Sequence, residues 1–401
     1  MNFKVSLDFN RWRSALIGGI ALLVMTGLYL LQIAWPGKLT SAEAATAAAN
    51  SSLSAILHNP LNWPYKLLDF AWLQTPLRHT VSARLAAVCL VLLTAVVFYF
   101  LAKRWHGRVT AAYTVLIFAT STWLLQSGRS GVGQIMLVLV PLVLLLVASW
   151  LNTTDNHNRA LVLFALASSL ALLTPGAVWL LVVAIVLLGK VVTDHIKGAS
   201  AATKIVAGGI VAATAGILAY ACIQDPGLIR TWLGLPAVFD TPLTMLKQWL
   251  GSIAYLTVRG PDMSGGWLAH TPVLDVATTG LLVFGVFLYR KHLQSLRTRL
   301  LLAFFLVGSI LVALNGSVAL GYVIGIAYLV AATGLAYFQH KWFKIFPLNP
   351  IARGLATALI VLLVTAVVTF HTQRYFVAWQ RSPATQYIFR APSTKHSDLI
   401  Q

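Results

Sequence analysis

Acidic residues are scarce in this chain of 401 residues: ten side chains are aspartate or glutamate, and Glu43 is the single glutamate. Charged residues of both signs make up only 10% of the chain, whereas 58% of the residues are hydrophobic and the mean hydropathy is +0.80. Soluble globular domains carry about 25% charged residues. The composition therefore excludes a soluble globular domain and indicates an all-α, polytopic membrane protein.

The chain also lacks the residue patterns of several common site types. Its two cysteines, Cys89 and Cys222, have neither metal-like nor redox-like spacing, so we interpret both as packing residues. Ten scattered histidines include no His-x-x-x-His pair, and we predict no structural metal; a divalent cation at a lipid phosphate is left open. The sequence contains no nucleotide-binding glycine motif after a strand, no Ser-His-Asp order and no soluble sugar-nucleotide domain.

Apolar runs long enough to cross a bilayer recur along the whole chain. A transmembrane helix needs about 20 residues to span a hydrocarbon core about 30 Å thick. Length and hydrophobicity predict about eleven spans, at residues 14–34, 81–102, 109–125, 132–151, 159–173, 176–193, 203–223, 272–289, 299–314, 317–338 and 351–370. Only Thr174 and Pro175 separate the fifth span from the sixth, so this pair is either one kinked span or two short helices in a tight hairpin.

These spans predict one transmembrane domain over residues 1–370, followed by an external carboxyl-terminal tail over residues 371–401. Two external loops, 35–80 and 224–271, interrupt the domain. The first loop has an aromatic and amphipathic character that suits the lipid interface. External chemistry would have to lie in these two loops.

Basic residues cluster in short loops beside the spans. With the amino terminus in the cytoplasm, the short inner loops hold more than half of the 29 lysines and arginines, as the positive-inside rule requires. Such clusters fit membrane lipids with anionic headgroups, whereas nucleic-acid binders carry a basic soluble face with interleaved aromatics. Despite the net charge of +19, we predict no nucleic-acid partner and expect an integral protein of a bacterial plasma membrane.

Most of the acids fall on the predicted outer side: Glu43, Asp69, Asp225, Asp240, Asp262, Asp275 and Asp398. Topological bias alone produces such a pattern, and so does an external site that uses carboxylates. Glu43 has the same two interpretations. In the first turn of a helix that begins near Ser41, it would stabilise the helix dipole by about 0.3–1 kcal/mol; alternatively, it belongs to a site.

Several short motifs follow one another in an informative order. After Glu43 come residues 76–77 (PL), 82–85 (SARL), 127–129 (SGR) and 171–176 (ALLTPG). In this order they resemble the integral-membrane C-type glycosyltransferases, in particular glycosyltransferase family 39, the branch of protein O-mannosyltransferases and aminoarabinose transferases. The resemblance covers roughly residues 14–190, and beyond that only the spacing of the spans is similar.

Two positions depart from the pattern of that family. The family pairs an aspartate with a glutamate in its first external loop, whereas here Ala42 precedes Glu43. The lysine of the family's Leu-Thr-Lys-Gly-Pro turn is replaced by Pro175. The aspartate usually assigned as the general base is thus absent. Either Glu43 has taken over its role, or the catalytic function is altered or lost.

The resemblance implies a polyprenyl-phosphate sugar as the donor and leaves the acceptor unidentified. Transfer requires deprotonation of an acceptor hydroxyl and stabilisation of the leaving phosphate. We therefore predict Glu43 as the catalytic base, with Arg84 and Arg129 near the external ends of two spans as contacts to the donor phosphate. Outside the family context, an arginine at a span end commonly reaches lipid headgroups instead.

The second external loop contains VRGPDMSGGWLAHTP, whose glycines and prolines allow sharp turns. Four of its side chains are candidate contacts to the sugar or the acceptor: Arg259, Asp262, Trp267 and His270. Trp267 would offer a stacking face. The alternative is an ordered surface loop with an interfacial tryptophan.

The sequence as a whole predicts a glycosyltransferase that moves a sugar from a polyprenyl-phosphate donor at the extracytoplasmic face. The alternative is a catalytically inactive relative, or a membrane transporter of lipid or glycan. A transporter would carry polar or charged residues within its spans and often an internal repeat. The spans show almost no charge and no convincing repeat.

Overall fold

The computed structural model describes residues 9–261, 266–268 and 270–390, and every regular element in that part is helical. The prediction of an all-α polytopic fold is confirmed. The elements are α1 (Phe9–Leu30), α2 (Ser41–Ala49), α3 (Leu53–His58), α4 (Trp63–Leu73), α5 (His79–His106), α6 (Arg108–Thr120), α7 (Thr122–Ser127), η1 (Gly133–Ile135), α8 (Met136–Leu151), α9 (His157–Leu172), α10 (Ala177–Gly198), α11 (Ala201–Gln224), α12 (Gly227–Trp232), α13 (Pro242–Thr257), α14 (Val276–Arg290), α15 (Leu296–Asn315), η2 (Gly316–Leu320), α16 (Gly321–Ile345), α17 (Pro350–Gln373), η3 (Arg374–Trp379) and α18 (Pro383–Arg390).

Each predicted span coincides with an apolar helix. Six helical segments of the described chain are long and apolar enough to cross a membrane, and the fifth of these, Leu296–Ile345, contains both α15 and α16. Four further apolar helices are shorter, namely those at Gly18–Leu30, Arg108–Thr120, His157–Leu172 and Val276–Arg290. The number of membrane crossings therefore stays a prediction.

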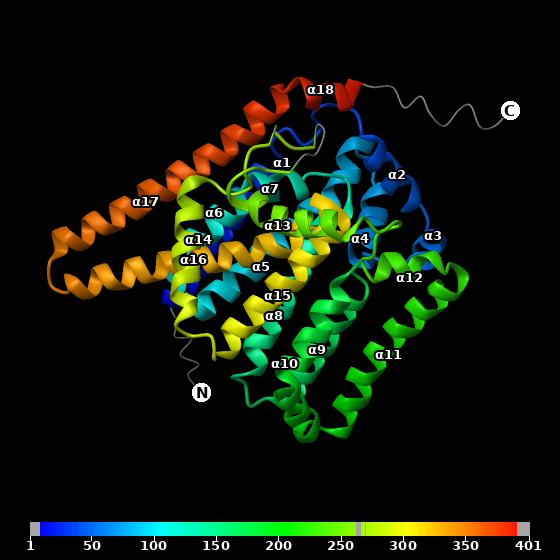
Figure 1. The fold of residues 1–401 in the computed structure, drawn as a ribbon, viewed down its shortest axis with the longest axis horizontal. Helices are drawn as coiled ribbons and strands as arrows, with labels where there is room; N and C mark the ends of the chain where they lie inside the picture. Colours follow the sequence, from blue (N-terminus) through cyan, green and yellow to red (C-terminus); the bar gives the residue numbers. More distant parts are fainter. Residues whose placement is uncertain (1–8, 262–265, 269, 391–401) are drawn as a thin grey trace, which may run out of the picture.

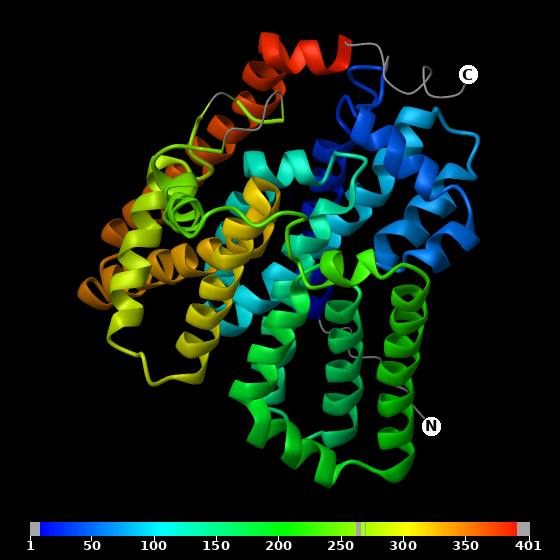
Figure 2. The same ribbon diagram turned by 45° about the vertical axis from the view of Figure 1, so that its right-hand side comes forward.

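The fifth and sixth predicted spans are two helices in a tight hairpin. Asn156 caps the start of α9 by accepting a hydrogen bond from the Arg159 amide, and Gly176 with φ of 74° turns the chain into α10. His157 at the start of α9 meets His195 near the end of α10, with their Nδ1 atoms 2.8 Å apart. The contact between opposite ends of the two helices excludes one kinked span. Figure 2 shows α9, α10 and α11 side by side.

The first external loop is a compact group of three helices, α2 to α4, which packs beside α5 (Figure 1). Its first two helices begin at residues whose hydroxyls accept backbone hydrogen bonds: Thr40 caps α2 and Ser52 caps α3. We call the end of the bundle that carries α2–α4 the loop end. The predicted topology places the loop end outside the cytoplasm.

Residues 371–390 are largely helical. Helix α17 continues past the predicted boundary to Gln373 and runs on as the π-helix η3, which packs against α7. Tyr375 and Trp379 of η3 are buried. Their rings stack on each other inside the protein, with centroids 5.0 Å apart.

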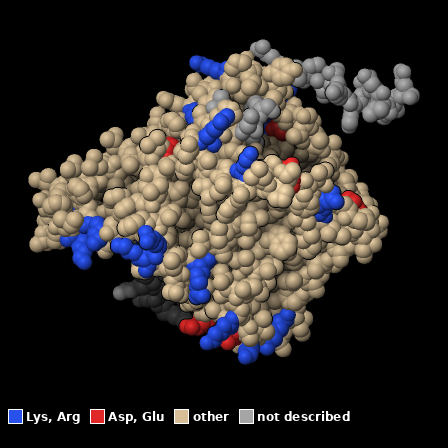
Figure 3. Space-filling model, in the orientation of Figure 1, with Lys and Arg blue, Asp and Glu red and all other residues tan. Residues whose placement is uncertain are grey.

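The surface of the molecule separates charge from apolar area. Lysine and arginine side chains lie along the lower rim of the view and around the upper part, and a broad band without charge lies between them (Figure 3). Helix α17, for example, exposes the apolar side chains Leu355, Leu359 and Leu362. Such a band fits the hydrocarbon core of a membrane.

Helices α14 and α16 approach each other more closely than ordinary side chains allow. A Cβ atom on Gly285 would lie 2.1 Å from the Val330 carbonyl oxygen, and one on Gly334 would lie 2.4 Å from that of Leu281. Small residues permit this kind of close backbone packing between membrane helices.

We expect Gly285→Leu and Gly334→Leu each to destabilise the protein by about 1–3 kcal/mol, because the added side chain meets backbone that cannot move aside. Thermal unfolding in detergent would measure the loss. Gly280→Leu is the matched control on α14, since a Cβ at Gly280 meets no atom within 4 Å. Equal melting temperatures for Gly285→Leu and Gly280→Leu would contradict the close contact.

Candidate functional site at the loop end

Glu43 is buried at the start of α2, with 4% of its surface exposed. The Thr40 amide donates to its Oε2 at 2.9 Å, while the Glu43 amide donates to Thr40 Oγ1 at 3.2 Å. This reciprocal pattern is a capping box, which satisfies two backbone donors of the first helical turn. The Gly131 amide, from the turn before η1, donates to Oε1 at 2.9 Å. The helix-start interpretation of Glu43 is therefore correct, and it is only part of the arrangement.

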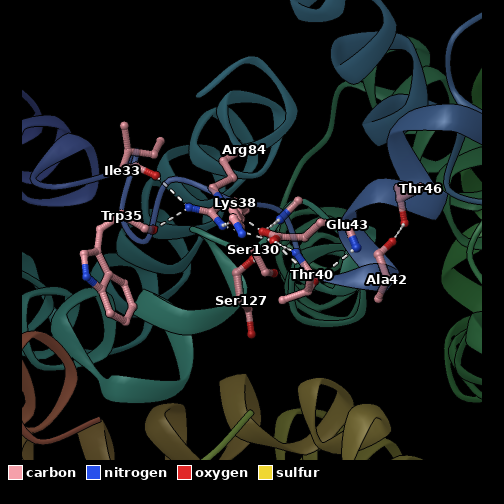
Figure 4. A network of polar contacts seen from close by, with 11 residues as sticks. Ile33, Trp35, Lys38, Thr40, Ala42, Glu43, Thr46, Arg84, Ser127 and Ser130 are labelled. Carbon is pink, nitrogen blue, oxygen red and sulfur yellow. Dashed lines mark hydrogen bonds and ion pairs between the residues drawn. The ribbon is translucent and has the colours of Figure 1, made fainter. Parts of the chain in front are cut away.

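Arg84 of α5 completes the environment of Glu43 (Figure 4). Its Nε donates to Glu43 Oε1 at 2.8 Å and its Nη2 to Oε2 at 3.0 Å, a two-pronged ion pair. The remaining donors bind backbone carbonyls: Nη1 donates to those of Ile33 and Trp35, and Nη2 to that of Lys38. All five N–H groups of Arg84 thus have protein acceptors. Arg84 ties the segment after α1 and the start of α2 to the second predicted span.

The pairing has a direct effect on the chemistry of Glu43. Burial by itself raises the pKa of Glu43, but the hydrogen bonds and charge of Arg84, with the Thr40 and Gly131 amides, outweigh it and lower the pKa. A carboxylate with a lowered pKa accepts protons weakly. To act as the base, Glu43 would have to accept a proton although its surroundings stabilise the charged form. To bind phosphate, Arg84 would have to release one of its present hydrogen-bond acceptors. The roles predicted for both residues stay predictions.

Arg129 is a buried cation without a carboxylate partner among the described residues. It is 6% exposed, and its Nη2 donates to the Leu31 carbonyl. Its Nε and Nη1 meet no acceptor in the described part of the chain. The rings of Tyr375 and Phe376 cover it, with their centroids 5.1 Å and 4.8 Å from Cζ. Of the two predicted phosphate contacts, Arg129 has hydrogen-bond donors to offer.

The second loop is arranged differently from the prediction. Trp267 is 3% exposed, and its indole Nε1 donates to the Thr271 carbonyl at 2.7 Å. The guanidinium of Arg374 lies over its ring, 4.7 Å from the centroid. The predicted stacking face for a sugar is thus occupied by protein. Arg259 and His270 are exposed, and the Gly260 amide donates to the His270 carbonyl at 2.8 Å; Asp262 lies outside the described residues.

The π-helix η3 contacts both Arg129, which follows α7, and the second loop. Its Tyr375 packs on Arg129, while its Arg374 packs on Trp267 and donates to the carbonyls of Pro272 and Thr271. Single π-helical turns occur frequently at functional sites. The sequence did not single out Arg374, because it follows directly on an apolar span and has no motif around it.

An apolar cavity of about 730 Å³ opens between α14 and the end of α17, beside Arg374. Its lining includes Leu274, Val276, Phe370, Val377 and Arg374. Arg374 is 6% exposed, and its Nε has no acceptor among the described residues. The charged residues of the lining are Arg374 and Asp275. The apolar walls suit a lipid chain, and Arg374 is a cation for an anionic head.

A buried relay of polar groups fixes the helix ends around this cavity. Asp275 caps α14 by accepting from the Thr278 amide at 2.9 Å, and its Oδ2 lies 3.1 Å from His371 Nε2. His371 Nδ1 lies 2.8 Å from the hydroxyl of Thr122, at the start of α7. The relay links α7, α14 and α17, and so positions η3. In the sequence, Thr122, Asp275 and His371 were recognisable only as polar residues at the ends of spans.

Asp69 is a second buried carboxylate of the first loop. It has no exposed surface, and the Asn50 amide donates to its Oδ2 at 2.7 Å, whereas Oδ1 has no partner in the described chain. Burial raises the pKa of Asp69 to about 6, against a smaller lowering by the Asn50 hydrogen bond. No group of three or more His, Cys, Asp or Glu side chains that could hold a metal occurs among the described residues.

We expect Glu43→Gln to destabilise the protein by about 3 kcal/mol at pH 7, because it leaves the buried charge of Arg84 unpaired. The pKa of Glu43 is lowered from an ordinary value of 4.5, so its contribution is complete above pH 4.5 and is lost as the pH falls through the lowered pKa. Melting temperatures of wild type and variant should therefore converge below pH 4.5.

The double variant Glu43→Gln/Arg84→Gln is the control for this measurement. Its loss of stability should be smaller than the sum of the losses in the two single variants, because each single change leaves the other side chain buried and unpaired. Losses in the single variants that add up to the loss in the double variant would rule out the ion pair as the source.

No protein-family model matches the chain, and no curated protein matches it. Among solved structures, the chain is similar to ArnT from Cupriavidus metallidurans in the apo state, with a TM-score of 0.58, 14% identity, and coverage of 95% of this chain and 78% of ArnT. It is also similar to the same protein bound to undecaprenyl phosphate, with a TM-score of 0.56, 15% identity, and coverage of 94% and 77%. The expected resemblance to membrane C-type glycosyltransferases is thus confirmed at the level of the fold.

Proposed function

We propose that the protein transfers a sugar from a polyprenyl-phosphate donor to an acceptor at the extracytoplasmic face of a membrane. The observation that carries the proposal is Arg129, a buried cation with free donors, in a fold similar to one whose structure holds undecaprenyl phosphate. A buried guanidinium without an anion is costly. A phosphate oxygen would satisfy both its charge and its hydrogen-bond donors.

In this proposal the donor lipid lies along η3. Its polyprenyl chain occupies the apolar cavity between α14 and α17, and Arg374 at the cavity is a further cation for the phosphate. Tyr375 and Phe376 form the cover that the phosphate displaces in order to reach Arg129. Arg84 and Glu43 support the site by holding α2 and the turn at Gly131 in place.

Two carboxylates of the first loop compete for the role of base. Glu43 is the candidate from the sequence. Asp69 is the candidate from the structure, because its surroundings raise its pKa to about 6, whereas those of Glu43 lower its pKa. A base works best with a pKa near the pH at which it operates. Both are buried, so the acceptor hydroxyl would have to enter the interface between α2 and α4.

The direct test is sugar transfer by the purified protein in lipid nanodiscs with a panel of radiolabelled polyprenyl-phosphate sugars. Transfer from at least one donor supports the proposal. Donor binding without transfer from any donor would instead support the alternative of a catalytically inactive relative. If the protein showed no donor binding and no transfer, the proposal would be refuted.

Arg129→Ala should weaken the binding of undecaprenyl phosphate by about tenfold or more, since a hydrogen bond to a charged group contributes about 1.5–3 kcal/mol. Binding to protein in nanodiscs would be measured by displacement of a labelled lipid phosphate. Arg381→Ala is the matched control, because Arg381 is exposed at the same end of the molecule. Unchanged affinity in Arg129→Ala would show that Arg129 does not contact the phosphate.

The choice of base can be tested by pH profiles of kcat. If Asp69 is the base, wild-type kcat should rise with pH through about 6, the pKa of Asp69, and Asp69→Asn should lose most of the activity while binding the donor normally. Glu43→Gln would then retain the same profile at reduced protein stability. A profile that disappears only in Glu43→Gln would identify Glu43 as the base.

A further inference from the structure

A second cavity, of about 520 Å³, lies at the loop end and differs in character from the apolar one. Five separate parts of the chain meet there: Asn62 before α4, the turn of η1, the turn between α9 and α10, the segment after α12, and the α15–α16 junction. These segments are far apart in the sequence. Their convergence at one place indicates a built recess rather than a gap beside a single loop.

Backbone hydrogen bonds and glycines shape the walls of this cavity. The Asn62 amide donates to the Leu173 carbonyl at 2.6 Å, and the Gly176 amide donates to that of Trp232 at 2.8 Å. Gly176 and Gly234 have φ of 74° and 66°, and a Cβ on Gly234 would lie 2.9 Å from the Gly176 Cα. Side chains there would clash or strain the backbone, so the glycines keep these two turns in contact.

The polar groups of the cavity are uncharged. None of its described lining residues is Lys, Arg, His, Asp or Glu, and its polar side chains are Asn62, Gln134, Thr231, Asn315 and Tyr322. Amides both donate and accept hydrogen bonds, as a ligand hydroxyl requires. An ionic ligand would find no counter-charge on these walls.

One of these polar groups is unsatisfied. Asn62 Oδ1 is buried and has no partner within the described chain. Asn315 uses its Nδ2 to donate to the Gly234 carbonyl at 2.7 Å, which orients its side chain at the cavity. A buried amide oxygen without a donor costs free energy unless water or a ligand satisfies it.

The cavity adjoins the candidate site through a short stretch of backbone. Gly131 binds Glu43, and two and three residues later Gly133 and Gln134 line the cavity. Tyr65 of α4 packs on Gly133, where a Cβ would lie 3.2 Å from its ring. A ligand in the cavity therefore lies next to the loop that carries Glu43 and Asp69.

We infer that this cavity binds an uncharged sugar ring, of the acceptor or of the donor. The inference rests on the proposed function for the role of the sugar, but the binding itself does not depend on transfer. Neutral amides, a threonine and a tyrosine in a recess of this size match a ring of hydroxyl groups and disfavour an anionic acceptor.

The test is saturation-transfer NMR on the protein in nanodiscs with neutral methyl glycosides of glucose, galactose and mannose; sugar-headed detergents are left out because they would compete. We expect saturation of at least one glycoside. Gln134→Leu should weaken its binding by about two- to tenfold, the effect of one lost hydrogen bond. Gln224→Leu is the matched control, because Gln224 is exposed and lines neither of the two cavities.

Competition identifies the source of the sugar. If the ring belongs to the donor, polyprenyl-phosphate sugar displaces the glycoside whereas sugar-free undecaprenyl phosphate does not. If it belongs to the acceptor, neither lipid displaces it. Absence of saturation for every glycoside, or equal binding in wild type and Gln134→Leu, would overturn the inference. Glycoside binding without transfer from any donor would instead count against the proposed function alone.

Discussion

The buried ion pair between Glu43 and Arg84 is the interaction on which the loop end depends. Two charges removed from water are costly, and here five donors on Arg84 and three backbone or hydroxyl donors around Glu43 offset that cost. The pair joins the end of α1, the start of α2, the second span and the turn before η1. Because so many segments meet at these two side chains, the contact positions the first loop against α5 and the turn at Gly131.

The distribution of charge around that pair separates two kinds of surface. Arg129 and Arg374 are buried cations with free donors: Arg129 packs on Tyr375 of η3, and Arg374 is the first residue of η3 and lines the apolar cavity. The second cavity, which Gln134 lines, has amide side chains and no charged side chain among its described lining residues. A sugar on a lipid phosphate needs both surfaces: a cationic, apolar one for the carrier and a neutral, polar one for a sugar ring. The presence of both surfaces in one chain gives the proposed transfer a physical basis.

The sequence predicted the helical class, the positions of the apolar helices and the neighbourhood of Glu43, because these follow from hydrophobic period and local chain order. It did not predict that Glu43 and Arg84 bind each other, since they are 41 residues apart and no local pattern encodes the contact. Trp267 was expected to be open to a ligand, and it is covered by Arg374, which comes from a helix more than 100 residues later. Asp69, Arg374 and Asn62 were missed because their significance lies in burial and absent partners, which only the folded chain shows.

The measurement that tests the account most directly is a structure of the protein in a nanodisc with undecaprenyl phosphate, by electron cryomicroscopy. The account predicts phosphate density within hydrogen-bond distance of the Arg129 guanidinium, the polyprenyl chain between α14 and α17, and displaced rings of Tyr375 and Phe376. Phosphate bound elsewhere, with Arg129 still covered, would contradict the proposed donor site.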